Sequence, residues 1–519
     1  MSEHSGVAVL QSMSQDLSPH RDILTTAKGG GIIFAGRLFE YASRFLFGII
    51  VARSIGADGY GLYSLGDTTA TVLAGIAMLG MSSGIVRFLP IALSERDEDR
   101  VWGTLQVAAM LVGALSLVLA LSVLGLADWA AEHLFHEPDV APVLRIISVW
   151  IPLIATARIL MAATRGFKQM QYQVYADSIA FSAIRIALTV LFLSLGLGVL
   201  GVSAAYAVAG AIEVGLLICF LNRLFPLRRP LRPARYNVRE LVSFSLPVCL
   251  TQLVRQFGGN FELLLLGILG TTALVGIYTA ALRVQMVGIM LLMAVETAAT
   301  PIISNLYHRG ANIQLGRLYQ TLTRWSLSFV LPFFVTIIFF ASPILSIFGE
   351  DFEAGGLALV VITLGTLVNA GTGICTAMIV MTGHSKLSLL NSTIALILTV
   401  ALNLVLIPAW GAAGAAAATA MSIAGVSIAR LLQVYWLHGL WPYNRTFVKP
   451  FIATAVAAAV GFVVSRLIPA NVSLFYLIFD VAALWLSYAV ATVLLGLSEE
   501  DSAVLHRTLG WFGTVLARH

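Results

Sequence analysis

The chain has 519 residues, of which 59% are apolar and only 11% are charged. A soluble domain contains about 25% charged residues, so this composition excludes a soluble fold for most of the chain. We therefore predict an all-α integral membrane protein. The net charge of +5 would suit nucleic acid. We exclude that partner because the positive charges lie in short loops between apolar segments, where membrane orientation explains them.

The first predicted element is a polar N-terminal tail, 1–28, which lacks the apolar segment of a cleaved signal peptide. A membrane-spanning helix needs about 20 mostly apolar residues. Fourteen such segments follow the tail, six of them in the first half at 29–55, 61–89, 101–126, 142–164, 174–197 and 199–222. A basic linker, 223–239, leads to six more at 240–268, 272–305, 316–341, 355–382, 386–408 and 411–437. An additional region, 438–497, holds two further spans, 447–468 and 472–497, before a C-terminal tail, 498–519.

Lys and Arg are concentrated in alternate loops, as in the linker 223–239, whereas the other loops are acidic around Glu132 and Asp351. Positive loops remain on the cytoplasmic side, so we predict a multi-pass protein of the cytoplasmic membrane with both termini in the cytoplasm. Glycine and proline at 196–198, 270–272 and 408–411 predict tight turns between neighbouring spans.

The sequence repeats itself after about 215 residues. The segment Gly56–Tyr63, which contains Gly61, matches Gly270–Tyr278, which contains Gly276, with one extra residue. Matching spans lie an even number of helices apart, so the repeat is parallel. It predicts two pseudo-symmetric lobes of six helices each, 29–222 and 240–437.

Several short motifs carry a family resemblance: Ala52-Arg-Ser-Ile-Gly56, Gly59-Tyr-Gly-Leu-Tyr63, Gly84-Ile-Val-Arg-Phe88 and the segment 402–414. With these motifs the chain resembles the polysaccharide-biosynthesis flippases of the multidrug/oligosaccharidyl-lipid/polysaccharide exporter superfamily. The resemblance covers 29–497. It implies two lobes around a central cavity that spans one, two, seven and eight line, and transport by alternating access. The two extra C-terminal spans are similar to those of the lipid II flippases, where they shape a groove for a lipid tail.

The resemblance also implies a substrate: a polyprenyl-diphosphate-linked oligosaccharide, moved from the inner to the outer leaflet for polysaccharide or cell-envelope glycan biosynthesis. Membrane lipids are the other expected contacts, and a glycan polymerase and glycosyltransferases of the same pathway are possible partners. The residues themselves leave two other functions open. One is a cation-coupled exporter of small amphipathic molecules, which would favour acidic residues in its cavity. The other is a membrane-embedded glycan polymerase or transferase, which would need catalytic carboxylates or large loops outside the membrane.

Arginines inside the spans are the candidate substrate-binding residues, because a charge at mid-bilayer is costly and usually serves a site or a pair. Arginine stays protonated and presents a planar fork that matches phosphate. The candidates for a cationic cavity are Arg37, Arg44, Arg158, Arg185, Arg255 and Arg283. Depth and the family's cavity helices favour Arg44, Arg255 and Arg283 among them. The alternative for each is a structural ion pair, such as Arg37 with Glu40 or Arg255 with Glu262.

Fewer acidic residues lie inside the spans. Four of them are candidates for charge pairing or for carrying a coupling ion: Glu40, Asp67, Glu262 and Glu296. The sequence leaves the ion open between H⁺ and Na⁺, and we expect no other cofactor and no metal site. It contains no GxxxxGK[ST], HExxH or GxSxG motif, so we expect a transporter without catalytic or ATP-binding chemistry.

Overall fold

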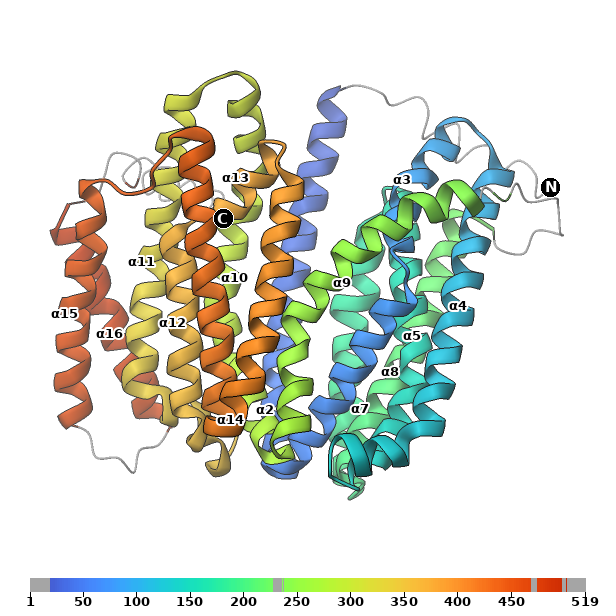
Figure 1. Ribbon diagram of the computed structural model, residues 1–519, viewed down its shortest axis with the longest axis horizontal. Coiled ribbons are helices and arrows are strands. Elements are labelled where there is room, and N and C mark those ends of the chain that lie inside the picture. The colour runs from blue at the N-terminus through green and yellow to red at the C-terminus, as the bar shows by residue number, and fades with distance from the viewer. Residues whose placement is uncertain (1–18, 227–235, 237, 468–473, 497–500, 502–519) are drawn as a thin grey trace, which may run out of the picture. The chain divides into compact units, whose positions relative to one another are not determined.

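The computed structural model describes residues 19–226, 236, 238–467, 474–496 and 501 (Figure 1). The described residues are almost entirely helical and form no strand, which confirms the predicted all-α class. The chain divides into two compact units, Met1–Gly276 and Ile277–His519. Most of the basic linker and both ends of the chain lie outside the described residues.

The first unit contains the helices that precede residue 277. Helix α2 begins at Pro19, ahead of the predicted start of the first span at residue 29.

The elements of the first unit are α2 (Pro19–Ala77), α3 (Met81–Ser94), α4 (Glu98–Trp129), the π-helix η1 (Ala130–Leu134), α5 (Val140–Gly166), α6 (Gln171–Gln173), the π-helix η2 (Val174–Phe181), α7 (Ser182–Ser194), α8 (Gly198–Leu224) and α9 (Val238–Leu269).

Helix α10 (Thr272–His308) begins in the first unit and continues into the second. The other elements of the second unit are α11 (Asn312–Leu345), η3 (Glu350–Gly355), α12 (Gly356–Thr372), α13 (Cys375–Met381), α14 (Ser385–His438), η4 (Arg445–Phe447), α15 (Val448–Leu467) and α16 (Leu474–Leu494).

Eleven helices in the described part of the chain are long and apolar enough to cross a membrane. Two of them, α2 with 59 residues and α14 with 54, are interrupted by a non-helical glycine, Gly56 and Gly411 respectively. A straight helix of that length would measure about 80 Å at 1.5 Å per residue, whereas a bilayer core is about 30 Å thick. Each of these helices therefore makes two passes, as the predicted turns required. The total of fourteen spans stays a prediction.

The additional C-terminal helices pack within the second unit. Ala453 and Ala457 of α15, with Leu484 and Tyr488 of α16, form a buried cluster against Val335 and Phe340 of α11. Beyond α16, the Asp501 carboxylate accepts hydrogen bonds from Arg324 (3.0 Å) and from the indole of Trp325 (2.7 Å). These contacts fasten the region after the twelfth predicted span to α11.

The sequence placed α9 at the start of the second predicted lobe. In the structure, α9 lies in the first compact unit and packs against α2, α3 and α4. The predicted lobe boundaries, 29–222 and 240–437, stay predictions.

Candidate functional site

The two repeat-related glycines lie against each other where α9 ends and α10 begins. A Cβ atom on Gly61 would overlap the carbonyl oxygen of Thr272, and one on Gly276 would overlap the carbonyl oxygen of Ala57. Close to them, the Thr272 hydroxyl donates a hydrogen bond to Asp58 Oδ1 at 3.0 Å. Only glycine permits such a close backbone approach at both positions. We call this end of the first unit the α9–α10 end.

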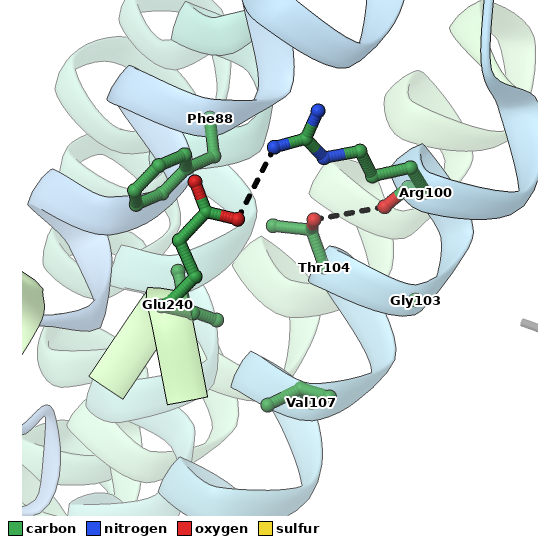
Figure 2. A pocket seen from close by; sticks show the side chains of 7 residues that line it. Phe88, Arg100, Gly103, Thr104, Val107 and Glu240 are labelled. Atoms are coloured by element: carbon green, nitrogen blue, oxygen red, sulfur yellow. Dashed lines mark hydrogen bonds and ion pairs between the residues drawn. The ribbon is translucent and has the colours of Figure 1, made fainter. Parts of the chain in front are cut away.

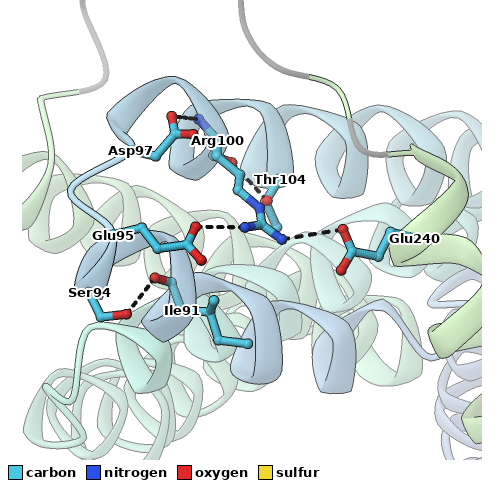
Figure 3. Close-up of polar contacts among 7 residues, drawn as sticks. All are labelled: Ile91, Ser94, Glu95, Asp97, Arg100, Thr104 and Glu240. Carbon is cyan, nitrogen blue, oxygen red and sulfur yellow. Dashed lines mark hydrogen bonds and ion pairs between the residues drawn. The ribbon is translucent and has the colours of Figure 1, made fainter.

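At the α3–α4 end of the same unit, charged side chains make the contact. Arg100, in the first turn of α4, donates to Glu95 Oε2 at 2.7 Å and to Glu240 Oε2 at 3.3 Å (Figure 3). Asp97 caps α4 by accepting a hydrogen bond from the Arg100 amide at 2.9 Å, which fixes the backbone that carries the guanidinium. Arg100 therefore joins the loop after α3 to the first turn of α9. We call Glu95, Arg100 and Glu240 the ionic lock.

The contact continues along α9, and we call the surface of α9 from Glu240 to Gln256 that faces α2, α3 and α4 the α9 seam. Arg87 of α3 lies over the ring of Phe244, with 4.2 Å between the guanidinium carbon and the ring centroid. Gln252 donates to Ser83 Oγ at 2.9 Å, and Gln256 donates to the carbonyl oxygen of Thr71. Polar and cation–π contacts therefore follow the seam away from the ionic lock.

Little space remains beside the ionic lock. A pocket of about 10 Å³ lies between Phe88, Arg100, Thr104 and Glu240 (Figure 2). A cavity needs about 10–15 Å³ to hold one water molecule. The residues around this pocket are therefore closely packed, with space beside Arg100 for about one water molecule.

Two of the sequence-predicted site residues meet on α2. Arg44 donates to Glu40 Oε1 at 2.8 Å, an i,i+4 ion pair in which 43% of the Arg44 side chain remains exposed. The sequence paired Glu40 with Arg37 in its alternative interpretation, but Arg44 is the partner that the structure shows. Arg37 is also exposed on this helix. The pair therefore leaves part of the Arg44 side chain exposed.

Arg185, another candidate, is in a different environment. Its side chain is only 2% exposed, and its guanidinium lies over the rings of Phe47 (4.4 Å), Phe181 (5.3 Å) and Tyr206 (5.2 Å). It also donates to the Tyr206 hydroxyl at 3.2 Å. In this conformation Arg185 braces α7 against α2 and α8, where no ligand can reach it. Substrate binding by Arg185 stays a prediction.

Three polar residues spaced at helical intervals around Arg185 are buried with it. Ser178, Ser182 and Thr189 are each 4% exposed or less. Their spacing of three to four residues is that of a single helix face. The aromatic rings around Arg185 gave no signal in the sequence, because Phe47, Phe181 and Tyr206 come from three different elements.

Two acidic members of this region, Asp177 and Glu213, lie inside predicted spans but are not among the candidate site residues selected from the sequence. Both lie within electrostatic range of Arg158 and Arg185, together with Glu40. Glu213 is 3% exposed, and its Oε1 accepts no hydrogen bond from the described residues. The available signal was an acidic residue in the middle of an apolar span.

Asp67 belongs to the same electrostatic neighbourhood, which includes Arg44 and Arg158. This charged cluster of the first unit therefore contains the arginines 44, 158 and 185 and the carboxylates 40, 67, 177 and 213, among the residues described. Its arginines and carboxylates come from α2, α5, η2, α7 and α8. Opposite charges at close range offset the cost of holding each of them within the membrane.

The remaining candidates are distributed over both units. The Arg255 side chain lies outside the described residues, and Glu262 is buried in the first unit. Arg283 belongs to the second unit, as does Glu296. The Glu296 carboxylate accepts a hydrogen bond from the Ala377 amide and lies within electrostatic range of Arg430. The combined site of Arg44, Arg255 and Arg283 stays a prediction.

Comparison with family models gives two matches. The model described as "Polysaccharide biosynthesis protein" matches residues 26–307, and the model described as "MatE" matches residues 247–405. The first match covers more than half of the chain and includes α2 to α9.

Curated relatives are similar at the sequence level. The "Probable flippase AglR" of Haloferax volcanii is 24% identical over 411 residues, which cover 76% of this chain and 81% of that protein. "Stage V sporulation protein B" of Bacillus subtilis is 23% identical over 273 residues, covering 50% of this chain and 52% of that protein. The "Probable low-salt glycan biosynthesis flippase Agl15" of Haloferax volcanii is 28% identical over 202 residues, covering 37% of this chain and 41% of that protein.

Solved structures show the same fold. The lipid II flippase MurJ in an inward closed conformation superposes with a TM-score of 0.72 at 16% identity, over 92% of this chain and 99% of that one. A multidrug resistance MATE family transporter of the MOP superfamily, inward-facing, gives a TM-score of 0.62 at 18% identity, over 76% and 94% of the two chains. The fold is therefore that of the MOP transporters, and the match to MurJ extends over more of this chain.

Proposed function

Because the chain belongs to the polysaccharide biosynthesis protein family, we propose that it flips a lipid-linked oligosaccharide across the membrane. The substrate is a polyprenyl-diphosphate-linked oligosaccharide, which moves from the inner to the outer leaflet of the cytoplasmic membrane by alternating access. The similarity to two proteins named as flippases, over 76% and 37% of this chain, supports this proposal. A glycan polymerase and glycosyltransferases of the same pathway would use or supply the substrate.

The observation that carries the substrate class is the partly exposed arginine on α2. Arg44 holds one carboxylate, Glu40, and still exposes 43% of its side chain. A diphosphate can exchange with or add to that carboxylate through charge-assisted hydrogen bonds, which are about twice as strong as neutral ones. Arg37, seven residues or about two helical turns earlier on α2, provides a second exposed arginine. Arg158, Arg185, Arg255 and Arg283 remain candidates for the same role.

A flipping assay in proteoliposomes tests this role. Arg44→Ala should reduce the flipping of a fluorescent polyprenyl-diphosphate oligosaccharide by about tenfold or more, because a charge-assisted hydrogen bond contributes about 1.5–3 kcal/mol. Arg44→Lys should recover only part of the activity, because lysine keeps the charge but lacks the planar fork.

The matched control is Arg145→Ala. Arg145 also forms an ion pair, with Asp128 at 2.7 Å, and its side chain is 50% exposed. It lies near the start of α5, 13 residues before Arg158 on the same helix. Arg145→Ala should flip the substrate at the rate of the unmodified protein. Full activity of Arg44→Ala would remove Arg44 from the substrate site.

The coupling ion belongs to the same proposal. Glu40, Asp67, Glu262 and Glu296 are the candidate carriers of H⁺ or Na⁺. Flipping should be measured under an imposed pH gradient, an imposed Na⁺ gradient and an imposed membrane potential. If one of these gradients drives flipping in the unmodified protein, that dependence should be lost when one acid is changed, Glu→Gln or Asp→Asn. The acid whose substitution removes the dependence would be identified as the ion carrier. Uptake of small amphipathic cations without flipping would instead favour the MATE-like alternative.

The orientation is also proposed, with both termini in the cytoplasm. A cysteine at Glu132 should react with an impermeant thiol reagent added to intact cells, and a cysteine at Ser385 should not. Glu132 lies in the acidic connection after α4, and Ser385 begins α14 after a predicted cytoplasmic turn. The reverse labelling pattern would invert the proposed orientation.

A further inference from the structure

We infer that the ionic lock is a gating element: α9 separates from α3 and α4 when Arg100 releases Glu240, and this opens the α3–α4 end of the first unit. The inference rests on the proposed function, because a flippase must expose its site alternately to the two sides. It assigns a role in transport to Glu95, Arg100 and Glu240, none of which is among the site residues predicted from the sequence.

The first argument is the geometry of the lock. The Arg100 guanidinium uses two of its nitrogens on two carboxylates from different elements, the loop after α3 and the first turn of α9. Arg100 is 18% exposed, whereas Glu95 and Glu240 are 51% and 49% exposed. The two acids are therefore hydrated, and water can replace the guanidinium when the contact breaks.

The second argument is the charge balance. One arginine faces two carboxylates, so the lock carries a net charge of −1, and the acids repel each other once Arg100 leaves. A contact of this kind has two discrete states, which is what a gate requires.

The third argument is that the polar contacts within the α9 seam and just before it can also exchange their partners with water. Gln252 and Ser83 are joined by a hydrogen bond of 2.9 Å, and Tyr236 donates to Gln106 Oε1 at 3.0 Å. Net hydrogen-bond energies are small because water replaces the partner when the pair separates. The small pocket beside Arg100 shows the seam in its closed state.

The test measures the seam directly. Spin labels at Ser94 and Ser243 report on the distance between the end of α3 and the start of α9; both serines are exposed and their side chains bond only within their own helices. The native cysteines 219, 249 and 375 are first replaced by alanine. Distances are measured by double electron–electron resonance in proteoliposomes without substrate.

Arg100→Glu brings three carboxylates together and should shift the distance distribution toward the separated state by about tenfold or more. The exchange Arg100→Glu with Glu240→Arg keeps one base and two acids, and should restore the short distance. Arg239→Ala is the matched control, since Arg239 is exposed, precedes Glu240 on α9 and forms no ion pair with the described residues. It should leave the distribution unchanged.

If Arg100→Glu does not fold, Arg100→Gln removes the charge without adding a third acid and should still lengthen the distance. A single short distance in the folded Arg100 variants would overturn the inference, as would failure of the charge exchange to restore it. These outcomes are distinct from failure of the proposed function. A seam that opens in a protein unable to flip a lipid-linked oligosaccharide would retain the gate and remove the substrate.

Discussion

The two ends of the first unit are joined by opposite kinds of contact. At the α9–α10 end, backbone packs on backbone, because Gly61 and Gly276 leave no side chain between the segments. At the α3–α4 end, long charged side chains bridge the gap, with Arg100 between Glu95 and Glu240. Backbone packing gains many small dispersion contacts that water cannot replace. Surface ion pairs have a median worth of about 0–1 kcal/mol and exchange readily with water.

The difference indicates which end opens more readily. Separating the α9–α10 end would expose closely packed backbone, whereas separating the α3–α4 end exposes side chains that water solvates well. We therefore expect the α3–α4 end to separate more readily than the α9–α10 end, which opens only when the site faces the other side. Four experiments test this contrast.

The largest effect is expected at Gly61. Gly61→Val would place its side chain in the position of the Thr272 carbonyl group. Overpacking typically costs about 1–3 kcal/mol of unfolding free energy, and a clash with backbone belongs at or above the upper limit. Thermal unfolding of the detergent-solubilised protein should show a large loss of stability.

Gly113→Val on α4 is the control, because a Cβ at Gly113 meets nothing within 4 Å. It should be close to the unmodified protein in stability. A Gly61→Val protein with unchanged stability would show that the backbone contact does not hold this end together.

The next largest effect is expected when each end is crosslinked in turn by a disulfide. A disulfide between Ser83→Cys and Gln252→Cys joins the α9 seam, where the native side chains lie 2.9 Å apart. A disulfide between Asp58→Cys and Thr272→Cys joins the α9–α10 end, where the distance is 3.0 Å. The first should reduce flipping by about tenfold or more until a reductant is added, because it removes the open state.

The second disulfide should also reduce flipping, because alternating access requires the α9–α10 end to separate when the site opens to the other side. Both pairs are made in the cysteine-free background and compared before and after reduction. Unchanged flipping with the first disulfide in place would contradict the gating role of the α9 seam, and unchanged flipping with the second would show that the α9–α10 end stays closed during transport.

A smaller effect is expected from Arg87. Its guanidinium lies 4.2 Å from the centroid of the Phe244 ring, across the α9 seam. An exposed cation–π contact contributes about 0.5–1 kcal/mol, so Arg87→Ala should raise the separated population about two- to fivefold. The spin-label distance between positions 94 and 243 measures the shift. Arg87→Lys keeps a cation at the ring, so its separated population should lie between those of the unmodified protein and Arg87→Ala. A larger shift for lysine than for alanine would exclude the cation–π explanation.

The smallest effect is expected from Tyr236→Phe, which removes only the hydrogen bond to Gln106. The tyrosine is exposed, so water replaces the lost partner and the separated population should rise by about twofold at most. The same spin-label distance reports this change. A shift as large as that of Arg100→Glu would show that the hydrogen bond of Tyr236 stabilises the closed state as much as the ionic lock does.

Much of the fold follows from the sequence because hydropathy and turn residues are local signals. The turn at 408–411 was predicted from proline and glycine, and α14 breaks at Gly411. The repeat at Gly61 and Gly276 was also visible in the sequence. Their mutual contact was not, because matching positions in two repeats need not meet in space.

The candidate site was predictable only in part. An i,i+4 pair such as Glu40 and Arg44 follows from helical spacing on a single helix. Arg100 and Glu240 are 140 residues apart and lie at helix ends, where positive charge predicts membrane orientation and no particular partner. Arg185 had a recognisable helix face, but the rings that surround it come from other elements.

The reciprocal contact of Gly61 and Gly276 also limits how the two halves of the gene can diverge. A bulky residue in one half is commonly tolerated when its neighbour in the other half becomes smaller. Here both neighbours already have the smallest side chain, and each faces the other's backbone segment. No compensating substitution exists, so the two repeats are expected to keep glycine together at this position while drifting apart elsewhere.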